Sequence, residues 1–395
     1  MSKNEIEILK KLISYPSITP KECGIYEYIK SILKGFKFIE FHQNDVKNIF
    51  FYRLENFSEQ ECTLGKVEDL SGFRHLSHLC FAGHIDVVPP GDGWRSDPFD
   101  AYEENDLIYG RGAQDMKAGV ASFIAALQSS THFNQKKPKA ISLLLTSDEE
   151  GDGFFGTKYV LEKLQEYQAI PNYVIVAEPT CINDFGDTIK VGRRGSINGV
   201  IKIFGKQGHV AYPEKCINPI ELLGGRLSKL AGIDLDDGNE LFSPSKLVLT
   251  DIRSGMEVVN VTPNDLKIMF NIRNNPLTSK EKVELYISEV LEGLNFSLEL
   301  KQNSEAFISK KDGLLVNILK QNIQKLTQIT PTLSTSGGTS DARFFAKYGS
   351  EVLEFGVKND TIHSIDERVS IAEVKQLTRI FTAVIEDFYE QKECE

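Results

Sequence analysis

Between residues 78 and about 192 of this 395-residue chain, short apolar runs alternate with helical patterns. The apolar runs read LCFAG, AISLLLT, YVIVA and DTIKVG, and helical spacing follows at 116–130 and 156–167. Strands that alternate with helices in this way form a largely parallel sheet with helices on both faces. The pattern therefore predicts an α/β fold built on a mostly parallel sheet flanked by helices.

Side chains suited to metal binding follow the apolar runs. His84 comes directly after LCFAG, and Asp86 lies two residues later, on the same face of an extended chain. Asp115 stands between a glycine-rich turn and an apolar helical pattern. The remaining groups are Glu149 and Glu150 after ISLLLTSD, Glu178 after NYVIVA, and His363 after VLEFGVKNDTI. Open α/β sheets place their sites at the carboxyl ends of strands, and this set of groups is suited to a pair of zinc ions.

The pattern changes between about 195 and 306. The segments SINGVIKIFG, INPIELLGGRLSKLA, KLVLTDIRSG, DLKIMFNIR, SKEKVELYISEVLEG and FSLELKQ read as strand, helix, strand, strand, helix and strand. This is the ferredoxin-like order. The α/β pattern then resumes, with helices expected at 339–347 and 371–390. We predict a catalytic zinc-binding domain of residues 1–193 and 307–395, and an inserted ferredoxin-like α+β lid or dimerisation domain of residues 194–306.

Composition narrows the possible partners and location. The net charge of −11 argues against nucleic acid or an anionic membrane as a partner. The sequence contains no run of about 18 apolar residues, so it predicts no membrane-spanning helix. The amphipathic start, MSKNEIEILKKLISYP, does not read as a signal peptide. The six cysteines are irregularly spaced without a C-x-x-C pair, which predicts reduced thiols in a cytoplasmic protein.

Residues 55–77 are polar and without a clear period, and we expect an excursion between two strands there. We interpret His75 and His78, at its end, as solvated loop residues rather than ligands.

Eight motifs occur in a fixed order along the chain: GHIDVVPPGDGW, GRGAQDMKAG, TSDEEGDG, AEPT, RRGS, QGHVAYP, GGTSDARF and NDTIHSIDE. With them the chain resembles the zinc deacylase and exopeptidase family that includes acetylornithine deacetylase, aminoacylases and bacterial glutamate carboxypeptidases. The likeness extends from about residue 5 to about residue 390 and leaves only residues 55–77 unmatched. RRGS, QGHVAYP and GGTSDARF most resemble the members that hydrolyse N-succinyl-LL-2,6-diaminopimelate in lysine and cell-wall precursor synthesis.

The resemblance implies a centre of two zinc ions per subunit. By that likeness, His84 and Glu178 would bind one zinc ion, Glu150 and His363 would bind the other, and Asp115 would bridge them. Cobalt is a possible substitute for zinc.

The resemblance also implies three catalytic residues outside the ligand set. Asp86 would orient the ring of His84. Glu149 would be the general base that takes a proton from the attacking water and passes it to the departing amine. His209, in the lid, would stabilise the oxyanion in the site of a partner subunit, which implies a homodimer formed through the lid.

The substrate implied by the likeness carries carboxylates beside its amide. Arginine matches planar carboxylates through two parallel hydrogen bonds, and Arg193 and Arg273 are the family-matched positions. The polar residues expected to assist them are Ser196, Tyr212, Asn260, Gly338 and Thr339.

Three alternatives remain open from the sequence. The same chemistry could act on N-acetylornithine or on a dipeptide, although an acetyl group has no carboxylate for an arginine to bind. A serine hydrolase using Ser340 or Ser147 would need a G-x-S-x-G elbow, which the chain lacks. A metal-free binding protein would be expected to have lost a ligand, and all five expected ligands are present.

Overall fold

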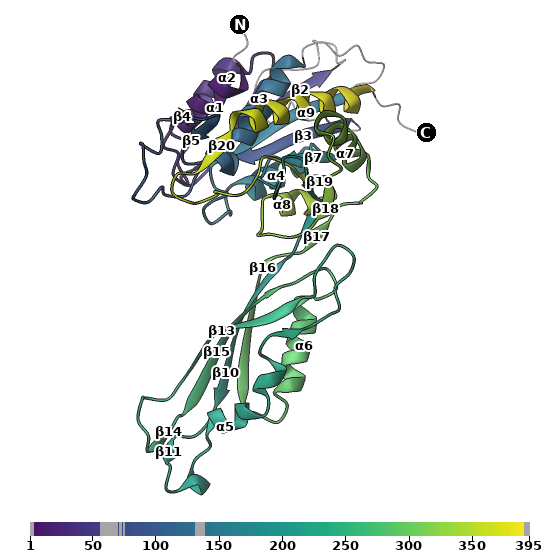
Figure 1. Ribbon diagram of the computed structural model, residues 1–395. Helices are drawn as coiled ribbons and strands as arrows, with labels where there is room; N and C mark the ends of the chain where they lie inside the picture. The colour runs from purple at the N-terminus through teal and green to yellow at the C-terminus, as the bar shows by residue number, and fades with distance from the viewer. Residues whose placement is uncertain (1–3, 56–69, 71–72, 74–75, 131–138, 391–395) are drawn as a thin grey trace. The chain divides into compact units, whose positions relative to one another are not determined.

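The computed structural model of this protein describes residues 4–55, 70, 73, 76–130 and 139–390 (Figure 1). The chain divides into two compact units. The first unit comprises Met1–Val191, Ser309–Ser334 and Ser340–Glu395, and the second comprises Gly192–Ile308 and Thr335–Thr339. Segment 335–339 thus groups with the second unit, whereas the sequence pattern assigns it to the first. Most of the excursion expected at 55–77, including His75, lies outside the described residues.

An eight-stranded sheet forms the centre of the first unit. In spatial order its strands are β1 (Lys37–Gln43), β2 (Val46–Glu55), β6 (Lys139–Thr146), β3 (Ser77–His84), β7 (Tyr173–Val176), β19 (Glu351–Glu354), β8 (Thr188–Lys190) and β18 (Thr332–Ser334). The four strands β6, β3, β7 and β19 are parallel to one another. The pairs β1–β2, β2–β6 and β19–β8 are antiparallel. The α/β fold is confirmed, with a mixed sheet whose middle is parallel.

Among the described residues of the first unit, seven α-helices flank this sheet. They are α1 (Glu5–Ile13), α2 (Ile25–Ile32), α3 (Ala118–Ser129), α4 (Thr157–Glu166), α7 (Leu314–Thr327), α8 (Ala342–Lys347) and α9 (Ile371–Glu390). Helices α1, α3, α7 and α9 pack together, and α4 packs against α8 (Figure 1). The ring centroid of Phe123 on α3 lies 4.3 Å from that of Phe81 on β3 and 4.5 Å from that of Phe381 on α9. This aromatic cluster fixes the helices on the sheet beside the strand that ends at His84.

A small three-stranded sheet lies next to the main one in the same unit. It consists of β4 (Tyr102–Glu104), β5 (Leu107–Tyr109) and β20 (Arg368–Ser370), with β5 in the middle. Because β5 pairs antiparallel with β20, Arg368 lies opposite Tyr109. The pairing brings the segment before Asp115 alongside the segment after His363.

The interpretation of His78 as a solvated loop residue is wrong. His78 is the second residue of β3 and is buried, with its Nε2 2.6 Å from the Ser142 hydroxyl of β6. Its ring also packs 4.7 Å from that of Phe73. Burial lowers the pKa of His78 to about 3, so the ring is neutral and belongs to the core.

The second unit is a ferredoxin-like α+β fold. Its sheet is antiparallel, with the strand order β12 (Ile233–Asp234), β13 (Lys246–Ser254), β15 (Asp265–Arg273), β10 (Ser196–Phe204) and β16 (Phe296–Ser304). The helices α5 (Pro219–Gly224) and α6 (Lys280–Val290) complete the β-α-β-β-α-β succession. Two short pairs extend it, β9 (Gly192–Arg193) with β17 (Phe307–Ile308) and β11 (Gly208–His209) with β14 (Val261–Thr262).

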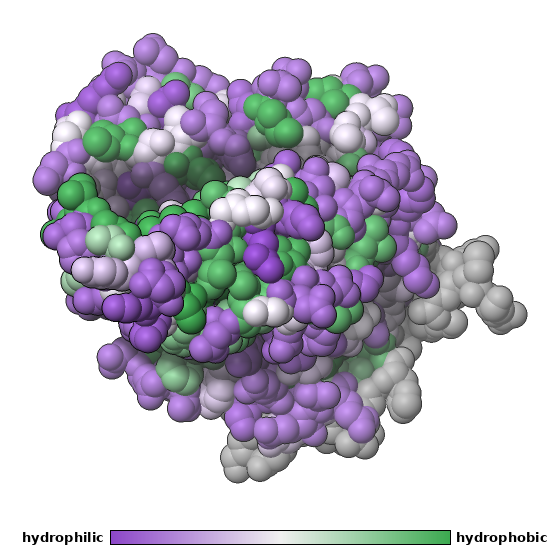
Figure 2. All heavy atoms as spheres, turned by 90° about the horizontal axis from the view of Figure 1, so that it is seen from below, coloured by the Kyte–Doolittle hydropathy of each residue, from purple (hydrophilic) through white to green (hydrophobic). Residues whose placement is uncertain are grey.

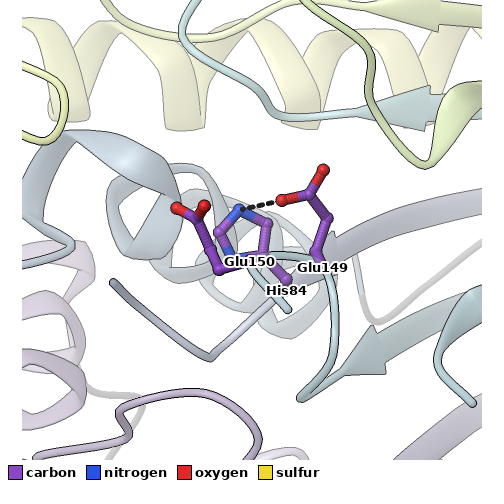
Figure 3. Close-up of side chains that lie close together, drawn as sticks. All are labelled: His84, Glu149 and Glu150. Atoms are coloured by element: carbon purple, nitrogen blue, oxygen red, sulfur yellow. Dashed lines mark ion pairs between the residues drawn. The ribbon is translucent and has the colours of Figure 1, made fainter. Parts of the chain in front are cut away.

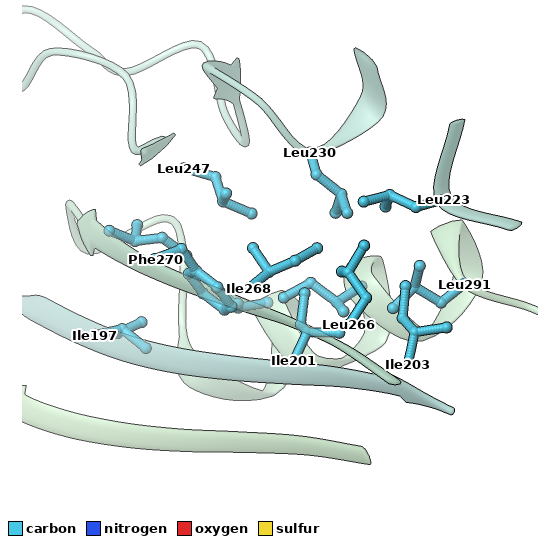
Figure 4. Close-up of a cluster of buried hydrophobic side chains, with 13 residues drawn as sticks. Ile197, Ile201, Ile203, Leu223, Leu230, Leu247, Leu266, Ile268, Phe270 and Leu291 are labelled. Atoms are coloured by element: carbon cyan, nitrogen blue, oxygen red, sulfur yellow. The ribbon is translucent and has the colours of Figure 1, made fainter. Parts of the chain in front are cut away.

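Alternate side chains of these strands form the core of the second unit. Ile201 and Ile203 of β10 lie beside Leu266, Ile268 and Phe270 of β15, and all five are buried (Figure 4). Residues two apart on a strand point to the same face, so one face of the sheet is apolar and packs against the helices. Gly199 is needed between them because a Cβ there would lie 1.9 Å from the Phe270 ring.

The cysteines within the described part of the chain are Cys23, Cys80, Cys181 and Cys216, and all four are free thiols. None of the helices described above is both long and apolar enough to pass through a bilayer.

Candidate metal centre

Three neighbouring strands end at the centre. His84 is the last residue of β3, Glu149 and Glu150 follow the end of β6, and Glu178 follows the end of β7. These strands are parallel in the order β6, β3, β7, with His84 opposite Thr146. Their carboxyl ends therefore meet at one edge of the sheet, where α/β folds place ligands.

Asp115 lies between the two histidines. It projects from the irregular turn η3 (Ala113–Lys117) that leads into α3, and the peptide bond after it is cis. Its Oδ1 lies 3.3 Å from His84 Nε2, and its Oδ2 lies 3.5 Å from His363 Nε2. Each imidazole thus faces a different oxygen of the same carboxylate, which is the arrangement that a bridging ligand requires.

Two other carboxylates complete the surroundings of the histidines. Glu178 Oε1 lies 3.8 Å from His84 Nε2, and Glu150 Oε1 lies 2.8 Å from His363 Nε2. Ligand atoms of His84, Asp115 and Glu178 lie within 4.8 Å of one another, and the same holds for Asp115, Glu150 and His363. The five residues form two groups that could each hold a metal ion and that share Asp115.

The state of Glu178 fits a bound cation. Its Oε1 is buried and has no hydrogen-bond partner within the described ranges. A buried carboxylate oxygen without a partner is costly, and native proteins rarely contain one. Two imidazoles and three carboxylates are also a donor set that zinc accepts. The residues present therefore fit a metal pair.

Glu149 and Glu150 are adjacent but point in different directions around the ring of His84 (Figure 3). Glu149 Oε2 lies 3.9 Å from His84 Nε2, whereas Glu150 makes its close contact with His363. Both residues lie in the bend after β6, and their side chains diverge there, so one of the two can bind metal while the other remains free for proton transfer.

Asp86 organises the centre in two ways. The Nδ1–H of His84 donates to the main-chain oxygen of Asp86 at 2.9 Å, which leaves Nε2 free to bind a cation. The carboxylate of Asp86 accepts from the backbone N–H of Glu149 at 3.4 Å and from that of Glu150 at 3.1 Å. The ring of His84 is thus oriented mainly by a backbone oxygen, and the Asp86 side chain holds the turn that carries both glutamates.

The imidazoles and carboxylates of the centre shift one another's pKa values. Hydrogen bonds that His363 donates to the carboxylates of Asp115 and Glu150 raise the pKa of its ring to about 10. Burial disfavours the cationic form of His84, but Asp115, Glu149 and Glu178 outweigh it and raise the pKa of that ring. Burial and neighbouring carboxylates raise the pKa of Glu149 and of Glu178. A metal ion must therefore displace protons, so its affinity should increase with pH.

One group of the expected substrate residues lies at the β9 end of the second unit. Arg193 is buried in β9 and donates from Nη1 to the backbone oxygen of Ser336 at 3.1 Å, in the same short segment as Gly338 and Thr339. Ser196 begins β10 and accepts from Asn271 Nδ2 at 3.0 Å. Arg273 is the last residue of β15 and is exposed. The residue before it, Ile272, pairs with Ile197, the residue that follows Ser196 in β10.

The other group lies at the opposite end of the same unit (Figure 1). His209 is exposed in β11, and its ring centroid lies 6.0 Å from that of Tyr212. The backbone oxygen of Asn260 accepts from Val210 N at 3.2 Å. The nine residues of β10 separate this group from Ser196, which corresponds to about 26 Å at ~3.3 Å per residue.

Two buried residues next to the centre carry no role in the sequence analysis. Glu367 and Arg111 form an ion pair of 2.7 Å, and both side chains are buried. Their sequence signals are weak: Glu367 closes the NDTIHSIDE motif, and Arg111 lies in GRGAQD. A charged residue near a ligand is normally solvated, so only burial distinguishes these two.

The serine alternative finds no support in the geometry. The Ser340 hydroxyl donates to Glu354 Oε1 at 2.5 Å, and the Ser147 hydroxyl donates to the backbone oxygen of Pro20 at 2.8 Å. Both hydroxyls thus donate their proton to an oxygen rather than to the ring nitrogen of a histidine base.

The sheet topology and the two ligand groups that share Asp115 define an α/β protein with a candidate metal centre, and its relatives are metal-dependent hydrolases. The chain belongs to the peptidase family M20/M25/M40, whose model matches residues 80–387. Over 98% of this chain and 100% of the relative, it is 53% identical to a succinyl-diaminopimelate desuccinylase of Nautilia profundicola.

Solved structures share the fold. Aminopeptidase PepT of Bacillus cereus covers 98% of this chain and 99% of its own, with a TM-score of 0.74 and 18% identity. The YXEP protein of Bacillus subtilis, described as a dinuclear metal binding peptidase of the M20 family, covers 98% of both chains with a TM-score of 0.67 and 14% identity.

Proposed function

We propose that this protein hydrolyses N-succinyl-LL-2,6-diaminopimelate to succinate and LL-2,6-diaminopimelate, in the cytoplasm, as a step of lysine and diaminopimelate synthesis. The observation that carries the hydrolytic part is the position of Asp115, with one oxygen toward His84 and the other toward His363. The substrate is supported by the full-length likeness to a desuccinylase.

The proposed cofactor is a pair of zinc ions in each subunit, for which cobalt can substitute. His84 and Glu178 would hold one ion, Glu150 and His363 the other, and Asp115 both. A bound divalent cation supplies a Lewis acid that polarises the amide carbonyl and makes water more acidic.

Glu149 is the proposed general base. Its carboxylate is close to His84 but is not needed to complete either three-residue group that includes Asp115. Its raised pKa suits a group that takes a proton from water and later gives it to the leaving amine. Asp86 supports this role because its carboxylate holds the backbone N–H of Glu149.

The carboxylates of the substrate are assigned to the second unit. Arg193 and Arg273 would bind them in two-point contacts, assisted by Ser196, Gly338 and Thr339. The acidic net charge of the chain gives these cationic groups particular value for an anionic substrate. An N-acetylated substrate such as acetylornithine lacks the carboxylate of the succinyl group and would leave part of this set unused.

The test compares two substrates on zinc-loaded protein, with a chelator-treated control. We expect strong preference for succinyl-diaminopimelate over N-acetylornithine, and loss of both activities on chelation. Arg193→Met should lower kcat/KM for the succinyl substrate by about 10- to 100-fold, the worth of a charge-assisted hydrogen bond. Preference for acetylornithine would overturn the substrate, and full activity after complete metal removal would overturn the mechanism.

We further propose a homodimer formed through the second unit, as a lid and dimerisation domain. His209, Tyr212 and Asn260 lie beyond the far end of β10, a strand about 26 Å long, and are too far to contact a substrate held at the Ser196 end. A partner subunit could supply these three residues instead.

Apolar side chains are also unusually exposed in this unit, among them Ile220, Val248, Ile252 and Val259. Figure 2 shows apolar side chains gathered among polar ones on the face that it draws, and exposed apolar patches mark interaction sites.

Subunit mixing tests whether His209 acts across the dimer. Glu149→Gln and His209→Ala homodimers should both be nearly inactive. Refolding them together should restore activity to about a quarter of the wild-type value, because half of the dimers are mixed and each has one intact site. A mixture as inactive as its parents would refute contribution from the partner, and a fully active monomer would refute the dimer.

A further inference from the structure

A buried ion pair ties together two segments that carry ligands of the centre. Arg111 Nη1 lies 2.7 Å from Glu367 Oε2, with side-chain exposures of 2% and 1%. The pairing of β5 with β20 aligns the two residues, since Gly110 N also donates to the backbone oxygen of Glu367 at 2.9 Å. Arg111 lies four residues before Asp115, and Glu367 four residues after His363.

The carboxylate of Glu367 holds the Asp115 segment through its backbone. Its Oε1 accepts from the N–H of Gln114 at 2.8 Å and of Asp115 at 3.0 Å. Its Oε2 accepts from the N–H of Gly112 at 3.0 Å as well as from Arg111. All four donors converge on one carboxylate, so the backbone path that presents Asp115 depends on Glu367.

The guanidinium of Arg111 holds the His363 segment. Its Nη2 donates to the backbone oxygen of His363 at 3.3 Å and to that of Pro90 at 3.2 Å. His363 has a positive φ of 59°, a conformation that a non-glycine residue adopts only when its surroundings hold it. The Arg111 contact is one such restraint on its backbone.

We infer that Glu367 and Arg111 are positioning residues that set the separation of Asp115 and His363 for metal binding. Neither touches a ligand side chain; each acts on the backbone that carries one. The inference rests on the proposed metal-binding function. Glu367 positions Asp115, the residue that would bind both ions, so its loss should affect both sites. Arg111 positions His363, so its loss should chiefly affect the ion that His363 would bind.

The chemistry of two variants separates these roles. In Glu367→Gln the side chain keeps its size, but the amide has one oxygen and one NH2 group. Whichever way it is turned, the NH2 group faces backbone N–H donors that the carboxylate now satisfies. Arg111→Lys keeps the positive charge beside Glu367, but a single ammonium lacks the planar fork that reaches both Glu367 and the His363 oxygen.

Glu351→Gln is a matched control. Glu351 also accepts from two backbone N–H groups, those of Leu315 at 2.9 Å and Val316 at 3.2 Å, at the start of α7. It is partly buried in the same unit and is not among the residues of the centre. A general cost of losing a charged acceptor should therefore appear in both Glu367→Gln and Glu351→Gln, and a positioning effect only in Glu367→Gln and Arg111→Lys.

The first measurement is amide hydrogen exchange on metal-free protein. In Glu367→Gln, we expect amides of the segment 112–115 to exchange at least about 10-fold faster than in wild type, while those of α9 keep their wild-type rates. The control should show the increase at Leu315 and Val316 instead. Unchanged exchange at 112–115 would overturn the role of Glu367, whether or not the protein binds metal.

The second measurement is a zinc titration by calorimetry. Glu367→Gln should weaken binding at both sites by about 10- to 100-fold, and Arg111→Lys should weaken one site more than the other. Zinc affinities equal to those of wild type in both variants would overturn the inference. If wild-type protein binds no zinc, the proposed function fails, while the exchange experiment still decides the positioning. If Glu367→Gln does not fold, hydrogen exchange and zinc titration are both measured on Arg111→Lys.

Discussion

Replacing Glu149 by glutamine should lower kcat for succinyl-diaminopimelate by about 100- to 10,000-fold, the usual contribution of a general base. Glutamine has nearly the same shape but cannot take a proton from water. KM should change little, because Glu149 is not among the residues assigned to the substrate carboxylates. Steady-state kinetics with zinc-loaded variant and wild type at one pH measure the effect.

Two controls separate loss of the base from loss of the centre. Zinc titration of Glu149→Gln should still give two ions per subunit, because both groups that share Asp115 remain complete. The unfolding temperature of the metal-free variant should not fall at neutral pH. A carboxyl whose pKa is raised in the folded protein destabilises that state when ionised, and glutamine removes the charge. Near wild-type kcat with full zinc occupancy would assign the base elsewhere.

Asp115→Asn should produce the second large effect, the loss of tight binding at both metal sites. Asparagine offers one neutral oxygen where the native carboxylate presents Oδ1 to His84 and Oδ2 to His363. Affinity should fall by at least about 100-fold, more than for residues that act only through another side chain. Activity at micromolar zinc should be lost in parallel.

The control for this variant is Asp236→Asn in the second unit. Asp236 accepts from Asn275 at 2.6 Å and from Thr278 at 2.6 Å, so its loss should affect stability without touching the centre. Its zinc stoichiometry should remain that of wild type. If Asp115→Asn binds both ions with native affinity, Asp115 is not the shared ligand.

The residues around His84 show how far sequence alone could reach. An apolar run followed by a histidine or carboxylate predicts the carboxyl end of a buried strand, and all of β3 beyond Ser77 is buried as this requires. Because parallel neighbours end at one edge, the side chains after β3, β6 and β7 had to meet. The two-unit organisation and the ferredoxin-like order follow from a change in pattern near residue 195 in the same way.

His78 shows where such reasoning fails. A histidine after a polar stretch is normally solvated, but β3 begins one residue earlier and buries the ring beside Ser142 and Phe73. Strand boundaries depend on which neighbours pair, and pairing is a property of the assembled sheet rather than of the local sequence.

What the sequence determined by itself is the set of local preferences: where strands and helices form, and which side chains follow them. The tertiary structure alone decided which atoms meet. It turned the two oxygens of Asp115 toward two histidines, and it joined Glu367 to the backbone of Asp115 across 252 positions of the chain. The physical reason is that hydrogen bonds and ion pairs depend on distance and direction in space, which local propensity does not encode.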